Sequence, residues 1–128
     1  MKKPGLLLVT LCSVSIHAET LESATGHYES SVPLACNLVV ELSQNNGAGE
    51  FNVTTDSRSE TGRFILDGQY ITFSGLVAAD PGNNKEMEVS ALLSSDSLTI
   101  QNYGNSMNPY NLFPDCGPKY ITLDKTQS

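Results

Sequence analysis

The stretch GRFILDGQYITFSG, residues 62–75, predicts a tight β-hairpin. Asp67 and Gly68 suit a two-residue type I′ turn, in which both central residues need positive φ, and the flanking runs are β-branched and aromatic. With this turn Leu66 would face Gln69. Because side chains alternate between the two faces of a strand, the core face should hold one set of residues and the outer face another. The core set is Phe64, Leu66, Ile71 and Phe73, and the outer set is Arg63, Ile65, Tyr70 and Thr72.

The same period-two alternation continues on both sides of this hairpin. It is clear in CNLVVEL, GEFNVTT and EMEVSALL, and the segments between strands, such as NNGAG, DPGNN and SSDS, have turn composition. No stretch shows a helical period. The pattern predicts about eight strands, near 26–31, 36–44, 49–55, 62–66, 69–78, 86–93, 97–103 and 118–124.

Short strands at regular spacing favour an all-β fold. We predict a small up-and-down antiparallel β-barrel of about eight strands, in which closure removes the sheet edges, with a β-sandwich as the alternative. Closure would pair the strand near 26–31 with the one near 118–124. The irregular segment GNSMNPYNLFPDCGP would then be the connection that closure needs, because its prolines cannot donate ladder hydrogen bonds.

The first 18 residues, MKKPGLLLVTLCSVSIHA, have the layout of a secretory signal peptide. Lys2 and Lys3 give a positive start, an apolar run of about eleven residues follows, and Ala18 is a small residue at the expected cleavage point. The apolar run is too short to cross a membrane, which takes about 20 residues. We therefore expect residues 19–128 to form one periplasmic or secreted domain, with no membrane insertion after cleavage.

Two cysteines, Cys36 and Cys116, remain after cleavage. An even pair in a small exported domain is most simply one disulfide. This disulfide would attach the irregular segment and the last strand to the start of the second strand. The two cysteines are far apart and have no clustered histidines beside them, which argues against a redox or metal pair.

The net charge of the chain limits the classes of partner that it can bind. Cleavage would remove two of the seven basic residues and none of the fourteen acidic ones, which leaves a formal charge of −9. Nucleic acid and anionic membrane surfaces would repel such a protein, whereas a basic protein would attract it. We expect a protein partner, a basic hydrolase being the favoured kind, and no nucleic acid. The alternative is that the acidic charge serves only to keep the protein soluble.

The irregular segment before the last strand is the candidate binding site. Asparagine and tyrosine together make an adaptable polar and aromatic surface, of the kind that holds a protein or a sugar. Asparagine also tolerates left-handed backbone, so these residues could instead form turns while the aromatic rings cap one end of the barrel. The candidates are Asn102, Tyr103, Asn105, Asn108, Tyr110, Asn111 and Phe113.

No residue set amounts to a catalytic, metal or cofactor signature. His27 is the only histidine outside the signal segment and lacks a nucleophile motif or a second histidine, so we expect it on an outer strand face. Glu86 and Glu88 alternate on one strand face and, with Asp80, are better explained as solvated carboxylates than as a glycosidase pair. The segment DPGNNKE lacks the spacing of an EF-hand loop. We expect a protein that is not an enzyme and needs no metal or cofactor.

The stretch GHYESSVPLACNLVVEL resembles the opening of the bacterial serralysin-type metalloprotease inhibitors, small exported barrels of the lipocalin-like group. The matching positions are Gly26, Tyr28, Cys36, Leu38 and Val40. In that family a tryptophan stands where this chain has Tyr28, and the second cysteine follows much sooner. The resemblance covers about a sixth of residues 19–128; it implies a barrel and makes ETLESAT the counterpart of the tail that those inhibitors present to the protease.

These observations favour an exported barrel that binds a protein, as an inhibitor of a hydrolase or a protective factor against one, with a protease or lysozyme as the target. Bacterial lysozyme inhibitors are similar in size, compartment and strand content. The alternative is a lipocalin-like carrier of a small apolar or sugar-like ligand. Phe51, Phe64 and Phe73 argue against the carrier, because three phenylalanines would fill a barrel this small.

Overall fold

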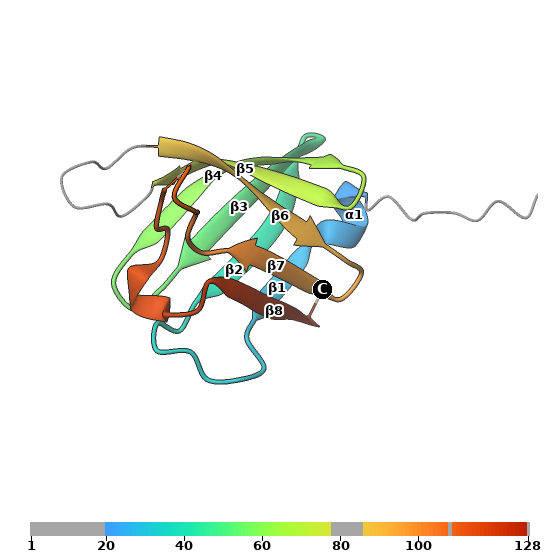
Figure 1. Ribbon diagram of the computed structural model, residues 1–128. Helices are drawn as coiled ribbons and strands as arrows, with labels where there is room; N and C mark the ends of the chain where they lie inside the picture. The colour runs from blue at the N-terminus through green and yellow to red at the C-terminus, as the bar shows by residue number, and fades with distance from the viewer. Residues whose placement is uncertain (1–19, 78–85, 108, 128) are drawn as a thin grey trace, which may run out of the picture.

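The protein is a closed β-barrel of eight antiparallel strands arranged in sequence order, as predicted. The computed structural model describes residues 20–77, 86–107 and 109–127. Each strand pairs with the next, and β8 returns to pair with β1, which rules out the sandwich alternative (Figure 1). The strands are β1 Gly26–Glu29, β2 Val39–Asn45, β3 Ala48–Thr54, β4 Ser59–Asp67, β5 Tyr70–Val77, β6 Glu86–Leu93, β7 Ser97–Gln101 and β8 Tyr120–Gln127.

The hairpin of β4 and β5 is present, but its turn differs from the predicted one. Asp67 pairs with Tyr70, so the two turn residues are Gly68 and Gln69, and Leu66 faces Ile71. The prediction that Leu66 faces Gln69 was wrong. Gly68 has a φ of 65°, and Asp67 does not have positive φ. A glycine at the first central position is typical of a type II′ turn, which lets Asp67 remain in its strand.

The predicted faces of this hairpin are nevertheless correct, because each residue pairs two positions away from its predicted partner and keeps its side of the sheet. Phe64, Ile71 and Phe73 are buried and Leu66 is partly buried. On the outer side Ile65 is 65% exposed and Tyr70 is 57% exposed. The alternation also holds in β2, β3 and β6, whose buried residues are Val40, Leu42, Phe51, Val53, Val89, Ala91 and Leu93.

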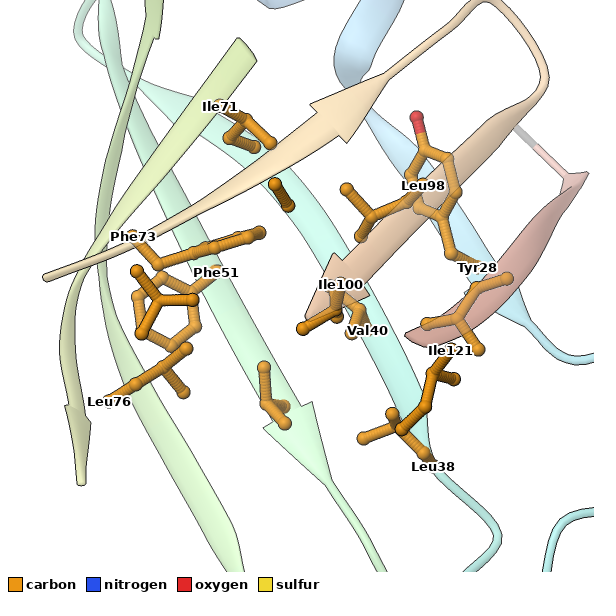
Figure 2. Packing of buried hydrophobic residues seen from close by; sticks show 14 of the residues in the cluster. Tyr28, Leu38, Val40, Phe51, Ile71, Phe73, Leu76, Leu98, Ile100 and Ile121 are labelled. Carbon is orange, nitrogen blue, oxygen red and sulfur yellow. The ribbon is translucent and has the colours of Figure 1, made fainter. Parts of the chain in front are cut away.

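Side chains from all around the barrel fill its interior (Figure 2). The rings of Phe51 and Phe73 meet edge to face with centroids 5.2 Å apart. Gly62 makes room for this packing, since a Cβ atom there would lie 2.3 Å from the carbonyl oxygen of Ser74 and 2.7 Å from the ring of Phe51. A Cβ atom at Gly49 would likewise lie 2.7 Å from the ring of Phe64. Two inward positions therefore lack side chains so that large rings can occupy the centre.

A short helix, α1 Leu21–Ala24, precedes the barrel, although the sequence showed no helical period. Four residues are too few to display one. Its N-terminus is closed by a capping box, in which Thr20 accepts a hydrogen bond from the Ser23 backbone and Ser23 accepts one from the Thr20 backbone. Ala24 is buried, and its carbonyl accepts a 2.7 Å hydrogen bond from the Tyr28 hydroxyl. The described part of the segment ETLESAT is thus attached to the barrel.

Closure of the barrel depends on short pairings. β6 and β7 pair through three residues each, and β1 pairs with β8 with a register shift between His27 and Tyr28. The predicted disulfide joins Cys36 to Cys116. β2 begins at Val39 rather than at the predicted residue 36, and Asn37 just before it has a left-handed φ of 51°. Within the described part of the chain, no helix has the length and apolar character to cross a membrane.

Candidate functional site

The segment between β7 and β8, residues 102–119, is built around one buried amide. Asn102 is 1% exposed. Its side-chain nitrogen donates to the carbonyl oxygens of Phe113 at 3.0 Å and Pro118 at 2.9 Å, and its side-chain oxygen accepts from the Phe113 backbone at 2.8 Å. Its backbone bonds Lys119 and Leu112. Asn102 therefore ties the outgoing and returning arms of the loop to each other.

The returning arm is fixed to the barrel by covalent and polar contacts. A single 3-10 turn, Pro114–Cys116, carries Cys116 into the disulfide with Cys36. Beside it, the Ser57 hydroxyl donates to the Asp115 carboxylate at 3.2 Å. Leu112 and Phe113 are buried in the core. The loop is consequently anchored at its base by apolar burial as well as by the disulfide.

Arg58 on the loop before β4 adds a third anchor. Its guanidinium donates to the carbonyl oxygens of Leu112 at 2.7 Å and Val77 at 2.6 Å, and it pairs with the Glu60 carboxylate. The other Glu60 oxygen accepts from the Val77 backbone at 2.9 Å. The guanidinium also lies 5.1 Å from the ring centroid of Phe113, within cation–π range. The side chains of Arg58 and Glu60 are largely buried, and these contacts supply their hydrogen-bond partners. Arg58 therefore joins β4, the end of β5 and the loop.

Beyond this base the loop forms a small hairpin with an exposed tip. Tyr103 forms an isolated antiparallel bridge with Asn111, and the Gly104 amide donates to the Tyr110 carbonyl at 2.9 Å. At the tip, the Asn105 side chain accepts from the Met107 amide at 3.0 Å. Met107 is 93% exposed and Tyr103 is 37% exposed. The tip thus presents an apolar side chain to solvent.

Tyr110 connects this hairpin to the last residue of β7. Its hydroxyl donates to the Gln101 carbonyl at 3.2 Å. Burial, together with the neighbouring Tyr120, raises the pKa of Tyr110 above its ordinary value, so the hydroxyl stays protonated at neutral pH and remains a donor. Tyr120 pairs with Gln101 across β7 and β8, is 59% exposed, and has the Lys119 ammonium 5.8 Å from its ring centroid.

We use the name closing-loop surface for the accessible side chains at this end of the barrel. Three of its members were candidates from the sequence and two were not. Tyr120 was not a candidate because the sequence places it in a predicted strand. Met107 was not a candidate because a methionine alone does not indicate a binding site. The surface consists of Tyr103, Asn105, Met107, Tyr110 and Tyr120.

The remaining sequence candidates have different surroundings. Asn102 and Phe113 are buried, so the structure places them in the base of the loop rather than on its surface. Asn111 is partly buried, and its side-chain oxygen has no hydrogen-bond partner among the described residues. Asn108 lies outside the described residues. The predicted group therefore divides into a structural base and an exposed tip.

Of the other ionisable residues considered from the sequence, His27 and Glu88 have described side chains and lie on different strands, β1 and β6. His27 points outward, with its ring nitrogens 3.2 Å from Glu41 and 3.4 Å from Glu29. Glu88 is exposed. Asp80 and the rest of the DPGNN turn lie outside the described residues. Among residues 20–77, 86–107 and 109–127, no three His, Cys, Asp or Glu side chains are grouped to hold a metal.

Two wide hollows lie elsewhere on the described part of the barrel, alongside smaller ones. A groove of about 740 Å³ crosses the outer face of β1 to β4 and is lined by residues that include His27, Glu41 and Asn52. A second hollow of about 540 Å³ lies between α1, the β2–β3 turn and the end of β4. Arg63 lines both.

Comparisons of the chain with protein-family models, with curated proteins and with solved structures found no match. The resemblance to the metalloprotease inhibitors therefore stays a prediction, and the assignment of function depends on the geometry above.

Proposed function

We propose that this protein is an exported β-barrel that binds a protein partner through the closing-loop surface, as an inhibitor of a hydrolase or a protective factor against one. The observation that carries the proposal is the contrast between the base of the loop and its tip. The base is buried and tied down at Asn102, Cys116 and Phe113, and the tip leaves Tyr103 and Met107 accessible.

A tethered loop with exposed tyrosine and methionine suits protein recognition. Tyrosine and methionine are enriched in the centres of protein interfaces relative to other surfaces. A loop that is already ordered loses little conformational entropy on binding, which improves affinity without additional contacts. Tyr110 is held by its bond to Gln101, and Tyr120 belongs to a strand, so the aromatic part of the surface is largely fixed before a partner arrives.

The charge of the chain supports a basic partner. Removal of the signal segment predicted over residues 1–18 would leave a formal charge of −9. A field of this sign speeds the encounter with a cationic protein and slows the encounter with an anionic one. Basic lysozymes and proteases with basic surfaces are therefore the first targets to try.

The filled interior favours protein binding over the carrier alternative. Phe51, Phe73 and the aliphatic residues around them occupy the centre of the barrel (Figure 2). A ligand enclosed in the usual lipocalin manner would have to displace this core. Any small ligand would find more room at the rim or on the outer face, where the two hollows lie.

The proposal is tested by mixing purified residues 19–128 with a panel of secreted proteases and lysozymes, measuring both enzyme activity and complex mass by native mass spectrometry. We expect a complex with at least one basic hydrolase at micromolar concentration. The variant Tyr103→Ala/Met107→Ala/Tyr120→Ala should weaken that complex at least tenfold, because truncating even one hot-spot side chain costs about 2 kcal/mol, which is more than tenfold in affinity.

Tyr70→Ala is the matched control. Tyr70 is 57% exposed on β5, close to the exposure of Tyr120, and lies outside the closing-loop surface. It should leave the complex unchanged. Equal weakening by the control and the triple variant would place the interface elsewhere, and no complex with any member of the panel or with host envelope proteins would refute the proposal.

A further inference from the structure

The hollow at the rim of the barrel is mostly apolar. Leu21 of α1, Ala48 after the β2–β3 turn, and Phe64 and Leu66 of β4 line it. Its volume, about 540 Å³, is within the range of small-ligand sites, roughly 300–1,000 Å³. Leu21 and Leu66 are only partly buried, so part of this apolar surface remains in contact with water. We call this hollow the rim pocket.

The strand register explains why the rim pocket is open. β3 pairs with β4 only as far as Gly49 opposite Phe64, whereas β4 continues to Asp67. The end of β4 therefore extends past β3. On the β3 side the wall contains Gly47 and Gly49, which contribute no side chains, and a Cβ atom at Gly47 would meet no atom within 4 Å.

One cation stands at the edge of the rim pocket. Arg63 is exposed on the outer face of β4, opposite Glu50 on β3 and Ser74 on β5. Within the described part of the chain, the ion pairs within 4 Å involve His27 and Arg58, not Arg63. The contrast with Arg58 is direct, because Arg58 is occupied by Glu60 and by two carbonyl groups. Among residues 20–77, 86–107 and 109–127, no carboxylate lies within 4 Å of the Arg63 guanidinium, which leaves its N–H groups available to a ligand.

We propose that the rim pocket binds a linear alkyl carboxylate, with the chain against Leu21, Phe64 and Leu66 and the carboxylate on Arg63. The planar guanidinium matches a carboxylate through two parallel hydrogen bonds. One cation at the edge of the pocket, in a protein of negative net charge, suits a ligand with one negative charge better than an anionic membrane surface. The site lies on other elements than the closing-loop surface and does not depend on the proposed function.

The test is isothermal titration of residues 19–128 with octanoate, decanoate and dodecanoate below their micelle concentrations, with decanol as the uncharged comparison. Each added methylene should tighten binding by up to about fourfold while the chain remains inside the pocket, which corresponds to about 0.8 kcal/mol per methylene. Decanoate should bind at least fivefold more tightly than decanol. An affinity that does not change with chain length, or decanol binding as tightly as decanoate, would overturn the proposal.

Variants of the pocket locate the binding. Arg63→Gln should weaken decanoate at least fivefold and leave decanol unchanged, whereas Lys119→Gln, which removes the same charge at the other end of the barrel, should change neither. Ala48→Leu should fill the pocket and weaken both ligands. Thermal melting confirms that each variant is folded. Equal effects of Arg63→Gln and Lys119→Gln would show that only net charge matters, and would refute the site.

The same variants separate this inference from the proposed function. Arg63→Gln and Ala48→Leu should leave the complex with a hydrolase unchanged, because neither residue belongs to the closing-loop surface. A loss of decanoate binding with the complex intact supports two independent sites. Loss of both would show that the rim pocket and the partner interface are one surface, which would overturn their assignment here.

Discussion

The hairpins from β2 to β5 and the closing segment from β6 to β8 are held together in different ways. β2 and β3 pair over the whole length of both strands, and β3 and β4 over six residues, with glycines that let phenylalanines meet in the centre. β6 and β7 pair through three residues, after which residues 102–119 leave the sheet. In this segment the disulfide, the Asn102 amide and the Arg58 guanidinium hold the chain in place instead of ladder hydrogen bonds.

This difference shows where a barrel can accommodate a binding loop. Regular pairing fixes the hairpins and leaves their side chains little freedom to serve another purpose. Where the ladder is interrupted, individual polar and covalent contacts maintain closure, and the residues between these contacts can project to solvent. Met107, 93% exposed only five residues after the buried Asn102, illustrates the transition.

The largest expected effect comes from removing the disulfide. Cys36→Ser/Cys116→Ser should lower the free energy of unfolding by about 4 kcal/mol, because the bridge spans 80 residues and restricts the unfolded chain. Urea unfolding followed by circular dichroism measures this change. A loss below 1 kcal/mol would mean that the pairing of β1 with β8 closes the barrel without help.

Asn102→Ala should be the next most damaging change, costing about 3 kcal/mol. It would remove three side-chain hydrogen bonds and leave the Phe113 amide and the Pro118 carbonyl group without these partners, whereas the Phe113 carbonyl would still accept from the Cys116 amide. Asn105→Ala is the control, because Asn105 is exposed at the tip, and it should cost less than 1 kcal/mol. Equal costs in the same urea assay would contradict the division of the loop into base and tip.

In the hairpin half, Gly62→Ala should cost about 2 kcal/mol through overpacking. The new methyl group would lie 2.3 Å from the Ser74 carbonyl oxygen, which cannot move without disturbing the strand pairing. Gly68→Ala is a useful comparison, since it meets no atom within 4 Å and strains only a φ of 65°. It should cost about 1 kcal/mol. A larger loss at Gly68 than at Gly62 would show that turn conformation limits stability more than core packing.

The sequence was informative where one physical pattern repeats. Alternation placed Val40, Phe51, Phe73 and Val89 in the core, and the pair of cysteines outside the predicted signal segment predicted the bridge. The hairpin turn was misplaced by one residue because DG satisfies the rules for two turn types. The outcome depended on which residue has positive φ, and only Gly68 does.

The candidate site was less predictable because its parts come together only in three dimensions. Arg58 reads as an ordinary loop residue, yet it bonds Leu112, 54 positions later in the chain. Asn102 and Asn105 look alike in sequence, and only the register of β7 with β8 decides that one is buried and the other exposed. Helix α1 is four residues long, too short for periodicity to indicate.

Both barrel closure and the proposed partner binding depend on the rigidity of the closing loop, residues 102–119. Hydrogen exchange followed by NMR would measure it at the amides of Asn102, Gly104, Leu112 and Cys116, all of which donate to backbone carbonyls. We expect protection comparable to that in β3 and β5, lost at least tenfold in Cys36→Ser/Cys116→Ser while β3 and β5 stay protected. Rapid exchange at these four amides in the oxidised native protein would contradict a tethered loop and remove the basis for its role in recognition.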